Sequence, residues 1–156
     1  MITLEQADRL IDTIFKRGAE LDCRPLSVIV VEPGCKVKAF KKEDGSSMIR
    51  FEMAYGKAYA ALAMGRSSKL VKVRADEKPV FMRYQVGASG GQIFPEGGGM
   101  QIRDAAGAVI GAVGVTGDTE DRDEELAAYG IRTIGLKTDE DCADMGRRGG
   151  IRLADA

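Results

Sequence analysis

The sequence contains no histidine and no tryptophan among its 156 residues. The absence of histidine excludes catalytic triads that use imidazole, zinc or iron sites with histidine ligands, and the side chain that most often moves protons near neutral pH. Any chemistry must therefore use carboxylates, Lys, Arg, Tyr, Ser, Thr, Cys or backbone groups.

An excess of charge of either sign is also missing. The chain has 23 basic and 24 acidic residues and a formal net charge of −1, so it lacks the positive charge with which proteins bind nucleic acid. Hydrophobic residues make up 44% and charged residues 30%, a balance typical of globular rather than disordered chains. We expect a single domain spanning residues 1–156.

Signals for targeting, disulfides and metals are scarce. No apolar run has the length of a membrane span, and the first residues lack the basic and apolar regions of a signal peptide. The three cysteines show no C-x-x-C spacing, which predicts neither a disulfide framework nor a zinc site. We therefore expect a cytoplasmic protein with reduced thiols and no metal, nucleic-acid or membrane partner.

Residues 118–125 contain six acids. They do not match a calcium-binding loop, and acids at the start of a helix are stabilised by the helix dipole. The run is interpreted as a solvated face, within which Asp123 is expected to cap the helix or to pair with a neighbouring subunit.

Apolar periodicity, β-branched runs and turn residues predict a mixed α/β chain. The predicted helices are 4–21, 47–64, 68–73, 79–88 and 118–129, and the predicted strands are 26–31, 37–41, 100–103 and 109–117. Thr3 and Gln6 have capping-box spacing, and Gly130 is expected to end the last helix. The charged stretch 74–78 is predicted as a solvated connection, 134–136 as a possible strand, and the tail from about residue 137 as loosely held.

The strand 109–117 contains two glycines, Gly111 and Gly114. They lie on opposite faces of a strand because side chains alternate with a period of two. Interior glycine weakens a strand and is usually tolerated where another backbone or a ligand comes close. The alanine-rich helix 47–64 is suited to such close packing.

Five short motifs stand in this order of elements: Asp44-Gly45, Lys57-Ala58, residues 98–102 (GGMQI), residues 110–117 (IGAVGVTG) and Asp123-Glu124. With them the chain resembles, over about residues 3–136, the GlcG/HbpS-like family, which includes the C-terminal domain of PduO-type corrinoid adenosyltransferases. Residues 110–117 are the specific part of the resemblance. Gln101 stands where the family commonly has proline, and Thr116 where it commonly has serine.

The resemblance implies a profilin-like α/β (α+β) fold, an antiparallel sheet flanked by helices, that assembles into homo-oligomers. It also implies haem as a possible cofactor, because some members bind haem and haem degradation has been attributed to the family. Without histidine, haem iron would need Tyr, Met or Cys ligands. The candidates are Tyr55, Tyr59, Met48, Met53 and Cys35, and helical spacing of Met and Tyr is equally typical of core residues.

Lys57 is charged within an otherwise apolar stretch. Such a lysine either meets an anionic ligand, acts as a desolvated amine in acid–base or Schiff-base chemistry, or extends past the apolar face into water. The loop 94–99 offers glycine amides that either form an anion-binding nest or allow close approach to the next strand. Glu96 beside them is the best-placed general base. Asp44-Gly45 is equally well explained as a turn.

These residues give one candidate site and three hypotheses for function. The candidate catalytic residues are Lys57 and Glu96, and the candidate ligand-binding residues are Glu43, Asp44, Arg50, Lys57, Glu96, Gly97, Gly98 and Gly99. The first hypothesis is an oligomeric protein that binds a small anionic organic molecule, haem in the family's best-known case. The second is an enzyme that uses Lys57 and a carboxylate on a small carboxylate or carbonyl catabolite. The third is a structural or assembly role without a ligand.

Overall fold

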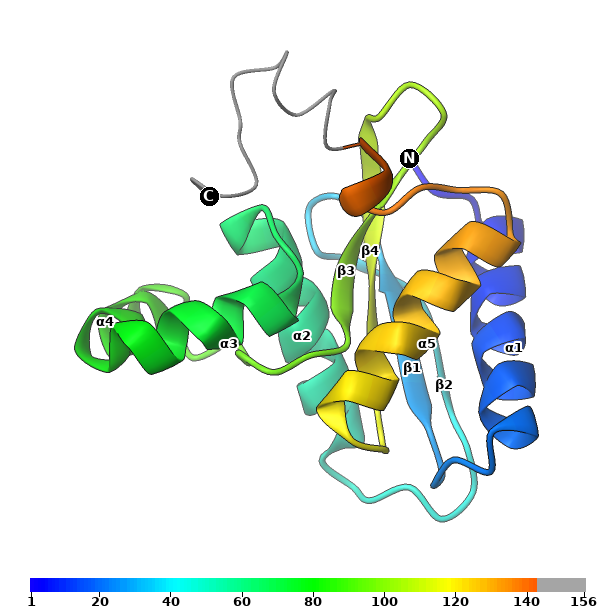
Figure 1. The fold of residues 1–156 in the computed structure, drawn as a ribbon, viewed down its shortest axis with the longest axis horizontal. Helices are drawn as coiled ribbons and strands as arrows, with labels where there is room; N and C mark the ends of the chain where they lie inside the picture. The colour runs from blue at the N-terminus through cyan, green and yellow to red at the C-terminus, as the bar shows by residue number, and fades with distance from the viewer. Residues whose placement is uncertain (143–156) are drawn as a thin grey trace.

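The computed structural model describes residues 1–142, which form five helices, four strands and one short 3-10 turn (Figure 1). The helices are α1 (Leu4–Glu20), α2 (Arg50–Met64), α3 (Ser68–Glu77), α4 (Pro79–Ala88) and α5 (Glu120–Thr133). The strands are β1 (Ser27–Val31), β2 (Val37–Lys42), β3 (Gly99–Arg103) and β4 (Val109–Thr116), and the turn is η1 (Glu140–Cys142).

The strands form one antiparallel sheet in the order β2-β1-β4-β3. All five residues of β1 are buried, as expected for a β-branched strand with a neighbour on each side and helices on both faces. Helices α1 and α5 cover one face and α2 covers the other, while α3 and α4 extend away from the sheet (Figure 1). This arrangement confirms the predicted flanked antiparallel sheet.

Each face of the sheet contributes to a separate hydrophobic core. Val28 and Val30 pack with α1 and α5, whereas Ile29 and Val31 pack with α2, because side chains alternate along a strand. Burying each such side chain stabilises the fold by about 1.5–3 kcal/mol. The predicted capping box at the start of α1 is confirmed: Thr3 and Gln6 each accept the other's backbone N–H through their side-chain oxygens.

Helix α2 lies directly on a pair of glycines. Gly99 of β3 stands opposite Gly114 of β4, and a Cβ at either position would collide with a carbonyl oxygen of α2, that of Lys57 or that of Ala54. Of the two alternatives predicted for glycines in this strand, the close approach of another backbone or of a ligand, the structure shows the backbone at Gly114. The main chain of α2, as well as its side chains, contacts the sheet.

Two predicted helix ends were wrong. Helix α3 runs to Glu77, so the charged stretch 74–78 is mostly helix and not a connection. The break falls at Lys78, because the residue before a proline is disfavoured in helical conformation. Helix α5 continues through Gly130 to Thr133. A Cβ at Gly130 would lie 2.6 Å from Ile14 Cγ1, so this glycine lets α5 approach α1 instead of ending the helix.

The segment after α5 also differs from the expectation. The possible strand at 134–136 is wrong, because these residues form a turn around Gly135, whose φ is 85°. A single β-bridge instead joins Lys137 to Arg103 at the edge of the sheet. The expected loosely held tail from about residue 137 falls mainly on 143–156, outside the described residues.

Candidate functional site

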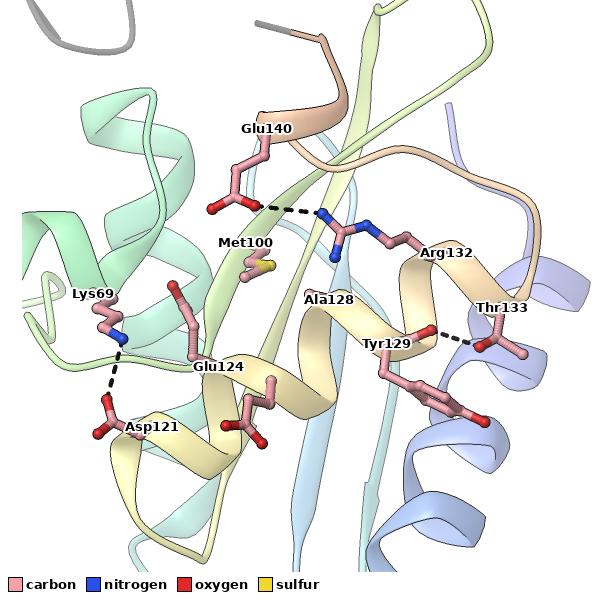
Figure 2. A pocket seen from close by; sticks show the side chains of 10 residues that line it. Lys69, Met100, Asp121, Glu124, Ala128, Tyr129, Arg132, Thr133 and Glu140 are labelled. Atoms are coloured by element: carbon pink, nitrogen blue, oxygen red, sulfur yellow. Dashed lines mark hydrogen bonds and ion pairs between the residues drawn. The ribbon is translucent and has the colours of Figure 1, made fainter.

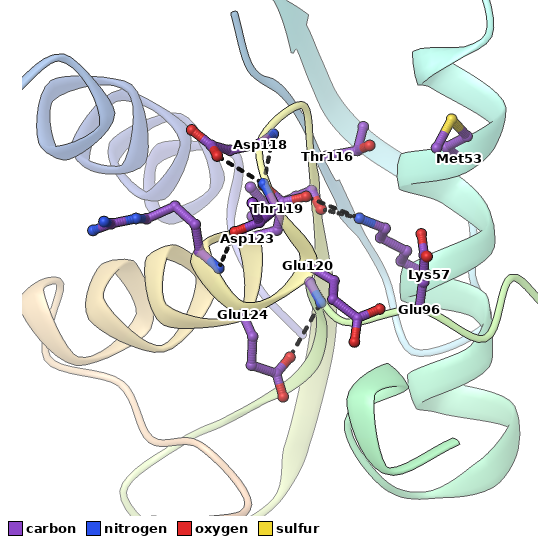
Figure 3. A network of polar contacts seen from close by, with 12 residues as sticks. Met53, Lys57, Glu96, Thr116, Asp118, Thr119, Glu120, Asp123 and Glu124 are labelled. Carbon is purple, nitrogen blue, oxygen red and sulfur yellow. Dashed lines mark hydrogen bonds and ion pairs between the residues drawn. The ribbon is translucent and has the colours of Figure 1, made fainter. Parts of the chain in front are cut away.

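Lys57 forms a buried ion pair with Asp123. Lys57 lies in the middle of α2 and is 1% exposed. Its Nζ lies 3.1 Å from Asp123 Oδ2 and donates to the Val115 carbonyl at 2.9 Å (Figure 3). The other Asp123 oxygen accepts the backbone N–H of Asp118 at 3.1 Å. The alternative in which the ammonium reaches water is wrong, and the anion that Lys57 meets belongs to the protein.

Burial dominates the electrostatics of this pair. Desolvation raises the pKa of Asp123 to about 6, although the charge of Lys57 and its hydrogen bond act in the opposite direction. Asp123 is 1% exposed, so the solvated face predicted for residues 118–125 does not include it. The capping role belongs to Thr119, whose hydroxyl accepts the N–H of Arg122. The pair therefore joins α2 to α5 within one chain.

The amides of the glycine-rich loop already have acceptors. Gly98 N–H donates to Glu124 Oε1 at 3.1 Å, and Gly99 N–H donates to Ser68 Oγ at 2.7 Å. The Ser68 hydroxyl in turn donates to the Glu96 carbonyl at 2.5 Å. These contacts favour the interpretation of the loop as a close approach between backbones, because both amides are engaged within the protein.

The remaining predicted residues lie elsewhere. Arg50, at the start of α2, donates to Thr116 Oγ1 at 2.8 Å. Glu43 accepts the N–H of Leu26 at 2.8 Å and lines a separate hollow with Asp44 beside the end of α1. The structure thus places Lys57 beside Gly98 and Gly99, whereas Glu43 and Asp44 line a hollow at a different place.

A cavity that the sequence did not reveal lies between α3, β3, α5 and residues 138–140. This inner cavity has a volume of about 240 Å³, and it shares six residues with a wider groove of about 790 Å³ along α5. Figure 2 shows the wider groove. The shared residues are Lys69, Met100, Glu124, Ala128, Arg132 and Glu140. Glu124, Ala128 and Arg132 are spaced by four along α5, which places them on one helix face. That spacing was the available sequence signal.

The inner cavity carries both charges and an apolar wall. Lys69 pairs with Asp121 at 3.2 Å, and Arg132 pairs with Asp141 at 3.1 Å and with Glu140 at 3.4 Å. Burial raises the pKa of Glu124, against the lowering effects of its hydrogen bonds to Ser67 and Gly98. A carboxyl group held beside an apolar wall can bind and orient a small ligand.

The part of the chain that the structure describes has no helix both long and apolar enough to cross a membrane. Within the same residues, no three Cys, Asp or Glu side chains gather as metal ligands.

Comparison with known proteins gives one family and several solved structures. A family model described as "Haem degrading protein HbpS-like" matches residues 2–132, and no curated protein matches the chain. The Klebsiella pneumoniae protein ORFY is 22% identical, with 85% of this chain and 90% of that chain covered and a TM-score of 0.77.

Two further solved structures are similar. A double mutant of Streptomyces reticuli HbpS is 22% identical over 86% of this chain and 87% of that chain, with a TM-score of 0.73. A PduOC:heme complex is 20% identical over 88% of this chain and 97% of that chain, with a TM-score of 0.78. At these identities the likeness shows a shared fold.

Proposed function

The chain belongs to the HbpS-like family, whose model matches residues 2–132, and from this premise we propose that the protein binds a small organic molecule in the inner cavity. The observation that carries the proposal is the cavity of about 240 Å³ with the Glu124 carboxyl group and an apolar wall. This volume lies below the roughly 300–1,000 Å³ of sites for drug-sized ligands, so the proposed ligand is small.

Haem is named for the family and for one of the similar structures, but three of the five candidate iron ligands of this chain, Tyr55, Cys35 and Met53, are poorly suited to bind it. The Tyr55 hydroxyl lies within hydrogen-bond distance of the Cys35 carbonyl and Gln92 Oε1, and burial raises the pKa of Tyr55 to about 12. Burial also raises the pKa of the Cys35 thiol. Both effects disfavour the anionic forms that bind iron. Met53 Sδ accepts from Arg50.

The residues behind the cavity support the proposal by fixing its wall. Gly98 holds one oxygen of Glu124, and the Lys57–Asp123 pair fixes the first turns of α5. We therefore propose that Lys57 and the loop containing Glu96, Gly97, Gly98 and Gly99 position the cavity rather than touch its ligand. The ligand-binding roles predicted for Arg50, Glu43 and Asp44 remain predictions.

A fragment screen by ligand-observed NMR tests the proposal. Ala128 lines the inner cavity, so Ala128→Phe should fill it and abolish the binding of most fragments that bind the wild type. Ala88, an exposed residue at the end of α4, supplies the control variant Ala88→Phe, which should keep all of them. Equal fragment binding by wild type and Ala128→Phe would refute the inner cavity as the site.

The predicted homo-oligomer stays a prediction that apolar side chains on the α3–α4 arm support. They are Leu70, Val73, Val80, Phe81 and Tyr84, each 43–67% exposed. Exposed apolar groups of this kind mark protein contacts, and light scattering would show an assembly as a multiple of 16.7 kDa. The enzyme hypothesis gains no support, because the ammonium of Lys57 is enclosed by the protein.

A further inference from the structure

The positive side chains at the inner cavity are already engaged by acids of the protein. Lys69 lies 3.2 Å from Asp121 Oδ1. Arg132 binds Asp141 with its Nε at 3.1 Å and contacts Glu140 with its Nη2 at 3.4 Å. An anionic ligand would have to compete with these carboxylates for either cation. The inner cavity thus offers no unpaired positive group among residues 1–142.

The negative side chains are not all engaged. Asp139, which also lines the cavity, binds Arg103 Nε at 2.6 Å and Gln101 Nε2 at 3.1 and 3.2 Å. Glu124 accepts the Gly98 N–H and is hydrogen-bonded to Ser67, and the charge of Lys69 acts on it from a longer distance. Within residues 1–142 it has no ion pair at 4 Å or less. Figure 2 shows the Glu124 side chain extending from α5 toward Met100 and Glu140. Among the carboxylates that line the inner cavity, it is therefore the one without an ion-pair partner within the described residues.

The rest of the lining suits a short aliphatic chain. Leu70, Met100 and Ala128 contribute apolar surface from three different elements, α3, β3 and α5. The volume of about 240 Å³ is that of about eight water molecules, since each occupies roughly 30 Å³ in liquid water. A ligand of a few methylene groups with one polar head fills such a space.

We infer that the ligand of the inner cavity is a small aliphatic amine whose ammonium group binds the Glu124 carboxylate while its methylene groups contact Leu70, Met100 and Ala128. The inference rests on the proposed function and gives its ligand a chemical class. It reverses the anionic ligand predicted from the sequence, because the two cations at the cavity are paired and the Glu124 carboxylate is not. Ammonium-to-carboxylate hydrogen bonds are charge-assisted and stronger than neutral ones.

Three probes of equal chain length and different head groups test the charge: pentylamine, pentan-1-ol and pentanoate. Each is titrated at pH 8 into the full chain and followed by NMR chemical-shift changes. We expect pentylamine to bind at least about tenfold more tightly than the other two, which corresponds to about 1.4 kcal/mol. Glu124→Gln keeps the acceptor for Gly98 N–H and the side-chain size, and should remove this preference.

The matched control is Glu125→Gln, since Glu125 is exposed, lines the wider groove but not the inner cavity, and lies 3.6 Å from Arg122. It should leave the preference for pentylamine unchanged. Equal affinity for the three probes, tighter binding of pentanoate, binding of none, or an equal loss in both variants would each overturn the inference. The proposed function is tested separately by the fragment screen. It is refuted when wild type and Ala128→Phe bind fragments equally, whatever the preference among the three probes.

Discussion

Replacing Lys57 by methionine removes the charge that faces Asp123 and keeps a side chain of similar length. Asp123 is 1% exposed and would remain as a buried carboxylate whose one remaining polar contact, among those the structure shows, is the N–H of Asp118. Val115 would also lose its donor from Lys57. Removing one partner of a buried ion pair costs about 3–5 kcal/mol. We expect Lys57→Met to lower the free energy of unfolding by this amount at pH 8.

The penalty should depend on pH. In the wild type the pKa of Asp123 is raised to about 6 from an ordinary 3.8, so its protonated form contributes stability that is full below about pH 4 and lost as the pH rises through 6. Lys57 lowers this pKa, and its loss raises it further. The penalty of the variant should therefore grow by up to about 1.4 kcal/mol per pH unit above pH 6, which gives about 2.7 kcal/mol between pH 6 and pH 8.

Urea unfolding at pH 5.5, 6.5, 7.2 and 8 measures this growth. The double variant Lys57→Met/Asp123→Asn has no carboxyl group to titrate at this site, so its penalty should not grow above pH 6. Lys72→Met is the surface control, because Lys72 pairs with Glu120 at 2.9 Å while both side chains are partly exposed, and it should cost about 0–1 kcal/mol. A penalty for Lys57→Met below about 1 kcal/mol, or one independent of pH, would refute the role assigned to the pair.

Two further predictions concern glycine and helix capping. Gly114→Ala should lower the free energy of unfolding by about 1–3 kcal/mol, because the added Cβ collides with the Ala54 carbonyl oxygen. The control Gly87→Ala in α4, where nothing lies within 4 Å of the added Cβ, should raise it by about 0.5–1 kcal/mol. An unchanged free energy of unfolding for Gly114→Ala, measured with urea, would contradict the close approach of α2. Thr3→Ala should cost about 1 kcal/mol through loss of the capping box, and an unchanged melting temperature would show that the cap does not stabilise α1.

The sequence predicted the elements whose signals are local. The capping box at Thr3, the β-branched strand β1 and the close approach at Gly114 each depend on a few neighbouring residues, and the structure has all three. Gly130 misled because a glycine signals either a helix end or a close helix contact, and only the position of α1 decides which.

The candidate site was harder to predict because its contacts join distant segments. Lys57 and Asp123 are 66 positions apart, and an acidic run at a helix start has an ordinary explanation in the helix dipole. Nothing local distinguishes Asp123, which is buried, from Asp121, which is exposed. The inner cavity draws on α3, β3, α5 and residues 138–140, so it exists only in the folded chain.

Asp123 and Glu124 are consecutive residues with opposite surroundings, one enclosed by the core and one at the cavity. A ligand bound to Glu124 would therefore contact the same helix turn that carries Asp123 of the buried pair. Asp123 is paired with Lys57, so this turn of α5 is joined to α2. Ligand binding should consequently slow hydrogen exchange of the amides around Lys57, so that occupancy of the cavity can be read from the opposite side of the sheet.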